Sequence, residues 1–111
     1  MKNILLFGSG RSTSSLIKYL LERTETHQFK LIIADQSITS IQEKVANNSN
    51  AQAIALDIHD SEAREMLIQK ADVVISMMPA FLHPIIANDC LKFSKHLVTA
   101  SYISQELKEM E

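Results

Sequence analysis

The chain contains only two glycines, Gly8 and Gly10, and both lie in one turn near its beginning. A 111-residue domain of average composition contains about 7 or 8 glycines. The scarcity of glycine elsewhere indicates that Gly8 and Gly10 are needed for a close approach of the backbone in this turn. A mostly apolar run, residues 3–7, comes before the turn, and a helical pattern from about Ser14 to Glu22 comes after it. A strand, a Gly-x-Gly turn and a helix in this order are typical of a dinucleotide-binding turn.

This turn predicts where the diphosphate of a dinucleotide binds. The first glycine permits the sharp bend, the second lets the backbone approach a pyrophosphate, and the helix offers free N–H groups to anions. We expect the diphosphate to contact Gly8, Ser9, Gly10, Arg11 and Ser12. The third small residue of the Gly-x-Gly-x-x-Gly/Ala pattern is replaced by Thr13, so the motif alone also fits an ordinary turn between a strand and a helix.

Apolar runs and helical patterns alternate along the whole chain. The expected strands are residues 3–7, 30–34, 51–56, 73–76 and 96–100. Strands that alternate with helices predict an α/β fold, here a Rossmann-type doubly wound parallel sheet with helices on both faces. Right-handed crossovers and a first strand that ends in the Gly-x-Gly turn favour the strand order 3-2-1-4-5.

Helical spacing also predicts which side chains of each helix face the core. The expected inward residues are Leu16, Ile17, Leu20 and Leu21, then Ile38, Ile41 and Val45, then Met66 and Leu67, and finally Ile85, Ile86, Cys90 and Leu91. Asp60 or Ser61 is expected to cap the third helix.

Asp35 ends the second expected strand, 25 residues after Gly10. An acidic residue at this place, about 20 residues after the turn, binds the adenosine ribose in dinucleotide-binding domains. Its carboxylate accepts hydrogen bonds from ribose hydroxyls and repels a 2′-phosphate. Gln36 follows rather than an arginine, so we expect NAD to be the cofactor, with NADP less favoured. A loop or cap role for Asp35 remains the alternative.

The ends of two further strands are expected to face the same crevice. Asp57 and Ile58 end the third strand, where we expect them to flank the adenine. The fourth strand ends in residues that are expected to line the nicotinamide half of the site: Ser76, Met77, Met78 and Pro79. The alternative is a purely structural role: a loop or cap residue for Asp57, and core methionines followed by a turn proline at the end of the fourth strand. His83, alone before Pro84, is more typical of packing or capping than of catalysis, so we assign no catalytic residue.

The composition excludes several other classes of function. The net charge is −2 and the basic residues are scattered, so nothing predicts binding to nucleic acid or to a membrane surface. No apolar run approaches the roughly 20 residues of a membrane span, and there is no signal-peptide pattern, so we expect a cytoplasmic protein. The single cysteine, Cys90, and four scattered histidines predict neither an internal disulfide nor a metal site.

Five segments together resemble the N-terminal cofactor domain of the saccharopine dehydrogenase family. They are residues 5–10, 55–57, 71–79, 82–84 and 95–104. The most specific is the last, which ends in Thr-Ala-Ser-Tyr-Ile-Ser, residues 99–104. The resemblance implies an oxidoreductase of lysine metabolism that forms or oxidises the secondary amine of saccharopine, most similar to the glutamate-forming branch.

The resemblance also implies roles for individual residues. Ser101 and Tyr102 would help to hold the amino-acid substrate, and Gly8, Asp35, Asp57 and the end of the fourth strand would hold the cofactor. Three features depart from the family pattern: Thr13 in the turn, Ala80-Phe81 in place of a Tyr-Thr-like pair, and Asp35 in a family that in part prefers NADP.

We expect residues 1–111 to be a dinucleotide-binding domain cut from a longer, homodimeric oxidoreductase. Hydride transfer requires a substrate held close to the nicotinamide with water excluded, so we expect the chain alone to bind NAD without turnover. Two alternatives remain open: an NAD-sensing regulatory domain of a transporter or channel, and the cofactor domain of a polyamine-forming relative.

Overall fold

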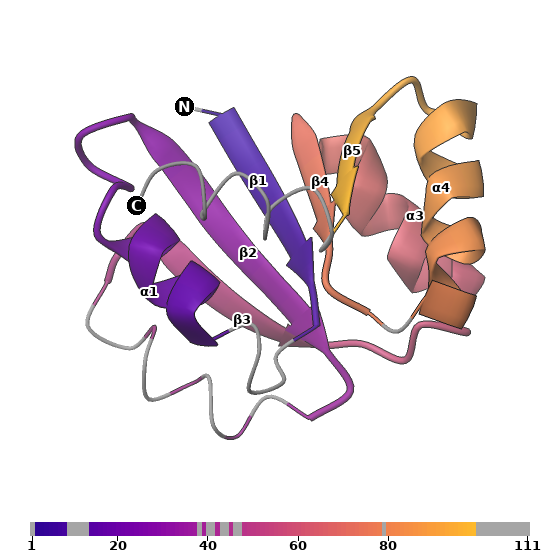
Figure 1. Cartoon of the computed structure of the whole chain (residues 1–111), viewed down its shortest axis with the longest axis horizontal. Coiled ribbons are helices and arrows are strands. Elements are labelled where there is room, and N and C mark those ends of the chain that lie inside the picture. The colour runs from indigo at the N-terminus through magenta and orange to yellow at the C-terminus, as the bar shows by residue number, and fades with distance from the viewer. Residues whose placement is uncertain are drawn as a thin grey trace.

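Five parallel strands form one sheet in the computed structural model, in the order β3-β2-β1-β4-β5 (Figure 1). The structure describes residues 2–8, 14–37, 39, 42, 45, 48–78 and 80–99. The strands are β1 (Lys2–Phe7), β2 (Phe29–Asp35), β3 (Ala51–Ala55), β4 (Val73–Ser76) and β5 (His96–Thr99). The predicted fold class and strand order are both confirmed.

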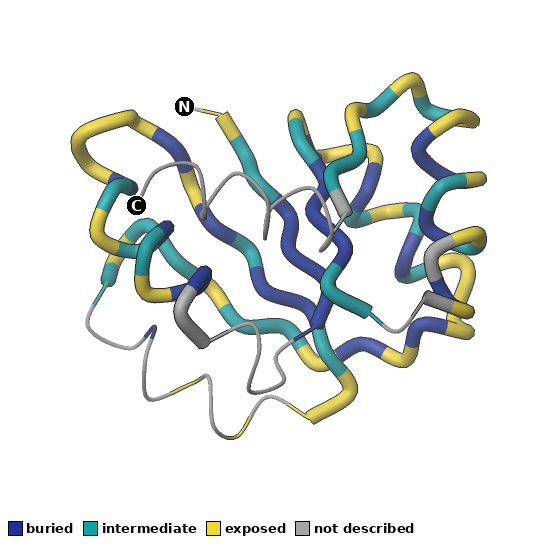
Figure 2. Tube along the Cα trace, in the orientation of Figure 1, coloured by how far each residue is buried: buried dark blue, intermediate teal, exposed yellow. Residues whose placement is uncertain are grey.

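The central strands bury side chains on both faces of the sheet, because successive residues of a strand point to opposite sides. Leu5 and Phe7 belong to one apolar cluster, while Leu6 between them belongs to the other. All three are at most 1% exposed. The dark blue stretches of Figure 2 follow this middle part of the sheet. A strand buried on both sides is what the uninterrupted apolar run of β1 predicts.

Helices cover the two faces separately. On one face α1 (Ser14–Leu21) packs Leu16, Ile17 and Leu20 against the sheet. The other face is covered by α3 (Ser61–Lys70) and α4 (His83–Lys92) (Figure 1). The short 3-10 helix η2 (Ala80–Leu82) precedes α4. Among the described residues, no helix is long and apolar enough to cross a membrane.

Two predicted inward residues are exposed instead. Met66 of α3 is 54% exposed and Leu91 of α4 is 79% exposed. On α3 the buried positions are Arg64 and Ile68, one helical turn apart, so the inner face of this helix contains a charged residue. Leu67 is half-buried as predicted, and Asp60 caps α3 by accepting a hydrogen bond from the Ala63 N–H at 3.2 Å.

The other helix predictions are confirmed where the structure describes them. Ile86 and Cys90 of α4 are buried. Val45 is also buried, in the same apolar cluster as the inward residues of α1. Ile38 and Ile41 lie outside the described residues.

Gly8 lies in close contact with the ends of β2 and β4. Its N–H donates a hydrogen bond to the Ala34 carbonyl at 3.0 Å, and the Met77 N–H donates to the Phe7 carbonyl at 2.9 Å. Gly8 has φ = +105°, and a Cβ at this position would lie 3.2 Å from the carbonyl carbon of Met77. A side chain is therefore disfavoured here both by the backbone conformation and by the lack of space.

We predict that Gly8→Ala lowers the free energy of unfolding by about 1–3 kcal/mol, because alanine must adopt a left-handed backbone against Met77. Urea denaturation measures the change. The matched control is Gln28→Gly, since Gln28 has φ = +53° and glycine relieves strain there. We expect this variant to be at least as stable as the unsubstituted chain. Equal stability of Gly8→Ala and the unsubstituted chain would contradict the prediction.

Candidate functional site

A cavity of about 300 Å³ opens where the carboxyl ends of β1, β2, β3 and β4 meet. Its size lies at the small end of ligand pockets. It is lined by the ends of these strands and by the residues that follow them: Phe7, Ala34, Asp35, Gln36, Leu56, Asp57, Ile58, His59, Met78, Phe81 and Leu82. In doubly wound sheets, ligands bind outside the carboxyl ends of the strands at the point where the strand order reverses.

Two carboxylates stand on one side of this cavity. The Asp35 carboxylate accepts a hydrogen bond from the Gln36 N–H at 2.6 Å, and the Asp57 carboxylate accepts one from the His59 N–H at 2.9 Å. Each carboxylate is thus held by the backbone of the loop that follows its strand. No lysine or arginine is among the described residues that line the cavity. The cavity is therefore suited to hydrogen-bond donors such as hydroxyl and amino groups, and it disfavours a phosphate.

Apolar side chains form most of the remaining cavity wall. Leu56 and Ile58 are buried in the core, while Phe81 is 77% exposed. An exposed aromatic ring and buried aliphatic residues in one cavity fit a flat, apolar ring system. No role at this cavity was predicted from the sequence for Phe81 or His59. Both follow a strand end, which is the signal that would have placed them at this edge.

The structure brings five of the predicted site residues together in this cavity: Asp35, Gln36, Asp57, Ile58 and Met78. Gly8 and Met77 lie in contact at the ends of β1 and β4, and Ser76 is fully buried at the end of β4. The remaining predicted residues lie outside the described ones: Ser9, Gly10, Arg11, Ser12, Pro79, Ser101 and Tyr102. Their roles stay predictions.

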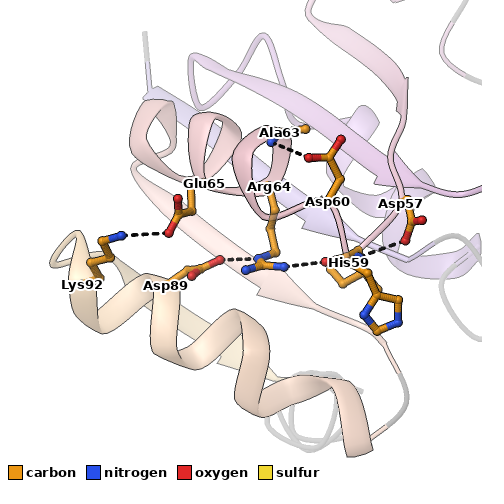
Figure 3. A network of polar contacts seen from close by, with 9 residues as sticks. Asp57, His59, Asp60, Ala63, Arg64, Glu65, Asp89 and Lys92 are labelled. Atoms are coloured by element: carbon orange, nitrogen blue, oxygen red, sulfur yellow. Dashed lines mark hydrogen bonds and ion pairs between the residues drawn. The ribbon is translucent and has the colours of Figure 1, made fainter.

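The loop between β3 and α3 forms one wall and is fixed by short-range hydrogen bonds (Figure 3). The Asp60 N–H donates to the Asp57 carbonyl at 2.9 Å, which closes a turn around Ile58 and His59. Asp60 also caps α3, so the turn runs directly into the helix. Ile58 and the backbone of Asp57 therefore have little freedom to move away from the cavity.

Parts of this arrangement fit a dinucleotide. The carboxylates of Asp35 and Asp57 offer acceptors for ribose and amino groups, and Gly8 lets the backbone after β1 lie close to Met77 without a side chain between them. The described residues that line the cavity fit the adenosine part of such a ligand. No group of three or more metal-ligating side chains is found among the residues that the structure describes.

Cys90 is not arranged as a nucleophile. It lies on the inner face of α4, 3% exposed, and does not line the cavity. Burial raises the pKa of its thiol above the ordinary value, and the neighbouring Asp89 carboxylate raises it further. A buried thiol with a raised pKa has little thiolate at neutral pH and is unreactive.

The family model described as the saccharopine dehydrogenase NADP binding domain matches residues 4–111. The chain is 38% identical over 85 residues to alpha-aminoadipic semialdehyde synthase of Arabidopsis thaliana, covering 77% of this chain and 8% of that protein. It is 31% identical over 111 residues to saccharopine dehydrogenase [NADP(+), L-glutamate-forming] of Schizosaccharomyces pombe, covering 100% of this chain and 24% of that protein.

A solved structure agrees with these matches. The apo form of histidine-tagged saccharopine dehydrogenase (L-Glu forming) from Saccharomyces cerevisiae superposes with a TM-score of 0.78 at 31% identity, over 100% of this chain and 24% of that chain. The chain thus spans about a quarter or less of the length of these relatives.

We predict that the native Cys90 thiol reacts with a disulfide reagent about 100-fold more slowly than the same thiol in the urea-unfolded chain. The control is Met66→Cys in a Cys90→Ala background, because position 66 is exposed on α3. We expect that thiol to react nearly as fast as in the unfolded chain. A native Cys90 that reacts as fast as the control would contradict its burial.

Proposed function

Because the chain belongs to the family of saccharopine dehydrogenase NADP-binding domains, we propose that it holds the nicotinamide dinucleotide of a saccharopine dehydrogenase-like oxidoreductase. When bound, such a cofactor accepts or donates a hydride. The observation that carries the proposal is the cavity at the carboxyl ends of the strands, with an acceptor at the end of β2 and another at the end of β3. Gly8, directly after β1, is hydrogen-bonded to Ala34, which lines the cavity.

We propose the following roles for residues around this crevice. Asp35 accepts hydrogen bonds from the adenosine ribose, and Asp57 and Ile58 contact the adenine. Gly8 approaches the diphosphate, together with the predicted contacts at Ser9, Gly10, Arg11 and Ser12. Met77 and Met78, with Ser76 and Pro79, line the nicotinamide half. These roles are supported by the position of each described residue at or beside the strand ends.

The substrate is proposed from the relatives. Their names describe glutamate-forming saccharopine dehydrogenases and alpha-aminoadipic semialdehyde synthases, so we propose a secondary amine derived from an amino acid, in lysine metabolism, as the substrate of the whole enzyme. Ser101 and Tyr102 remain the proposed substrate contacts. Residues 1–111 as a cofactor domain, a homodimeric assembly and a cytoplasmic location belong to the same proposal. None of the relatives reported above is a transporter or channel regulator.

Our proposal for the preferred cofactor differs from the cofactor that the relatives' names specify. The family description and the name of the Schizosaccharomyces pombe enzyme specify NADP. We propose that this chain prefers NAD, because a 2′-phosphate on the adenosine ribose would lie beside the Asp35 carboxylate. The Asp57 carboxylate in the same cavity adds to the repulsion, and the described lining residues include no arginine or lysine to neutralise it.

We predict that the chain binds NADH more tightly than NADPH, and that Asp35→Asn weakens NADH binding roughly tenfold while it narrows or reverses the preference. The amide keeps the size of the carboxylate but loses its charge, and a hydrogen bond to a charged group contributes about 1.5–3 kcal/mol. Titration followed by cofactor fluorescence measures all four dissociation constants.

The matched control is Glu25→Gln, which removes the same charge at an exposed position on the opposite edge of the sheet. We expect the two dissociation constants of this variant to equal those of the unsubstituted chain. Tighter binding of NADPH than of NADH by the unsubstituted chain would overturn the role of Asp35. Failure to bind either cofactor would overturn the proposed function.

A further inference from the structure

Arg64 is buried on the inner face of α3, where only 8% of its surface is exposed. A buried arginine must be paired, since removing an unpaired charge from water is very costly. Its guanidinium has two partners: the Asp89 carboxylate of α4, which Figure 3 shows, and the main-chain carbonyl of Ile58. The Nε–H donates to Asp89, and the Nη1–H donates to the Ile58 carbonyl at 2.6 Å.

One partner of Arg64 belongs to a wall of the cavity, and the other lies on the helix that continues from a second lining element. Ile58 lies in the loop between β3 and α3, and its side chain lines the cavity directly. Asp89 lies on α4, which follows the 3-10 helix η2 without a break, and η2 contributes Phe81 and Leu82 to the cavity lining. The guanidinium therefore joins the loop that contains Ile58 to the helix that continues from η2.

Arginine is suited to this task because its donors form a rigid planar fork. Nε–H and Nη1–H point in fixed directions, so one side chain holds Asp89 and the Ile58 carbonyl in a defined relative position. A lysine presents one charged nitrogen on a flexible stem and cannot reproduce that geometry. Buried ion pairs often add little net stability compared with apolar pairs of similar size, so stability alone is a weak reason for this one.

We propose that Arg64 is a positioning residue for dinucleotide binding: it holds the Ile58 loop and α4 at the spacing that the adenosine half requires. This inference rests on the proposed function, because the cavity is taken to receive adenosine. Arg64 does not line the cavity and acts through Ile58 and Asp89.

A second contact between α3 and α4 provides a matched control. The Lys92 ammonium lies 2.9 Å from the Glu65 carboxylate, and both side chains are at least partly exposed, at 61% and 28%. This pair joins the same two helices but touches neither Ile58 nor the cavity. Glu65→Gln thus removes an interhelical ion pair without releasing the loop.

The experiment compares three variants with the unsubstituted chain, and measures melting temperature together with the dissociation constants for NADH and for AMP. The variants are Arg64→Lys, the double variant Arg64→Met with Asp89→Leu, and Glu65→Gln. The double variant replaces the buried charges with apolar side chains of similar volume, which preserves or restores stability. It still removes the hydrogen bond to the Ile58 carbonyl.

We expect Arg64→Lys and the double variant to bind NADH and AMP roughly tenfold more weakly, the effect of one lost hydrogen bond to a charged group. The double variant is expected to do so while its melting temperature stays near that of the unsubstituted chain. Glu65→Gln should bind both ligands within about twofold of the unsubstituted chain, as for a partly exposed ion pair.

Two results would overturn the inference alone. One is unchanged binding of NADH and AMP in both Arg64 variants. The other is a double variant that regains affinity together with stability, since Arg64 would then serve only to stabilise the fold. If the unsubstituted chain binds neither NADH nor AMP, the proposed function fails and this inference fails with it.

Discussion

The close approach of Gly8 to Met77 is the constraint on which the crevice depends. Gly8 donates a hydrogen bond to the Ala34 carbonyl of β2 and lies against the backbone that follows β4, so the end of β1 is held between its two neighbouring strands. With no side chain at this position, the backbone can lie close to Met77 at the switch point of the sheet. Ala34, the hydrogen-bond partner of Gly8, lines the cavity formed by the ends of β2, β3 and β4.

The two ends of the crevice differ in charge, and we propose that they bind different parts of the dinucleotide. At the glycine turn, free N–H groups at the start of α1 would favour the diphosphate. At the ends of β2 and β3, Asp35 and Asp57 would accept hydrogen bonds from neutral hydroxyl and amino groups and repel a further phosphate. The chain belongs to a family described by NADP binding, and our proposal assigns the dinucleotide to this crevice and its preference for NAD to Asp35.

Local patterns in the sequence predicted the fold, the family and the strand-end residues, because parallel strands bring their carboxyl ends to one edge whatever the details of packing. Asp35, Asp57 and Ile58 were placed correctly at that edge for this reason. Arg64 was missed because its partner, Asp89, lies 25 residues away and only tertiary packing joins them. Met66 was predicted to face inward and is exposed instead, because Arg64 and Ile68 occupy the inner face of α3.

The central claim is that a dinucleotide binds at the carboxyl edge of the sheet. Amide NMR shifts of the isotope-labelled chain during titration with NADH test it most directly. We predict the largest shifts at Gly8, Gln36 and His59. Small shifts are expected at a separate cavity at the opposite edge of the sheet, which Glu22 and Thr26 help to line. Shifts concentrated at that opposite edge, or the absence of any localised shift, would contradict the account.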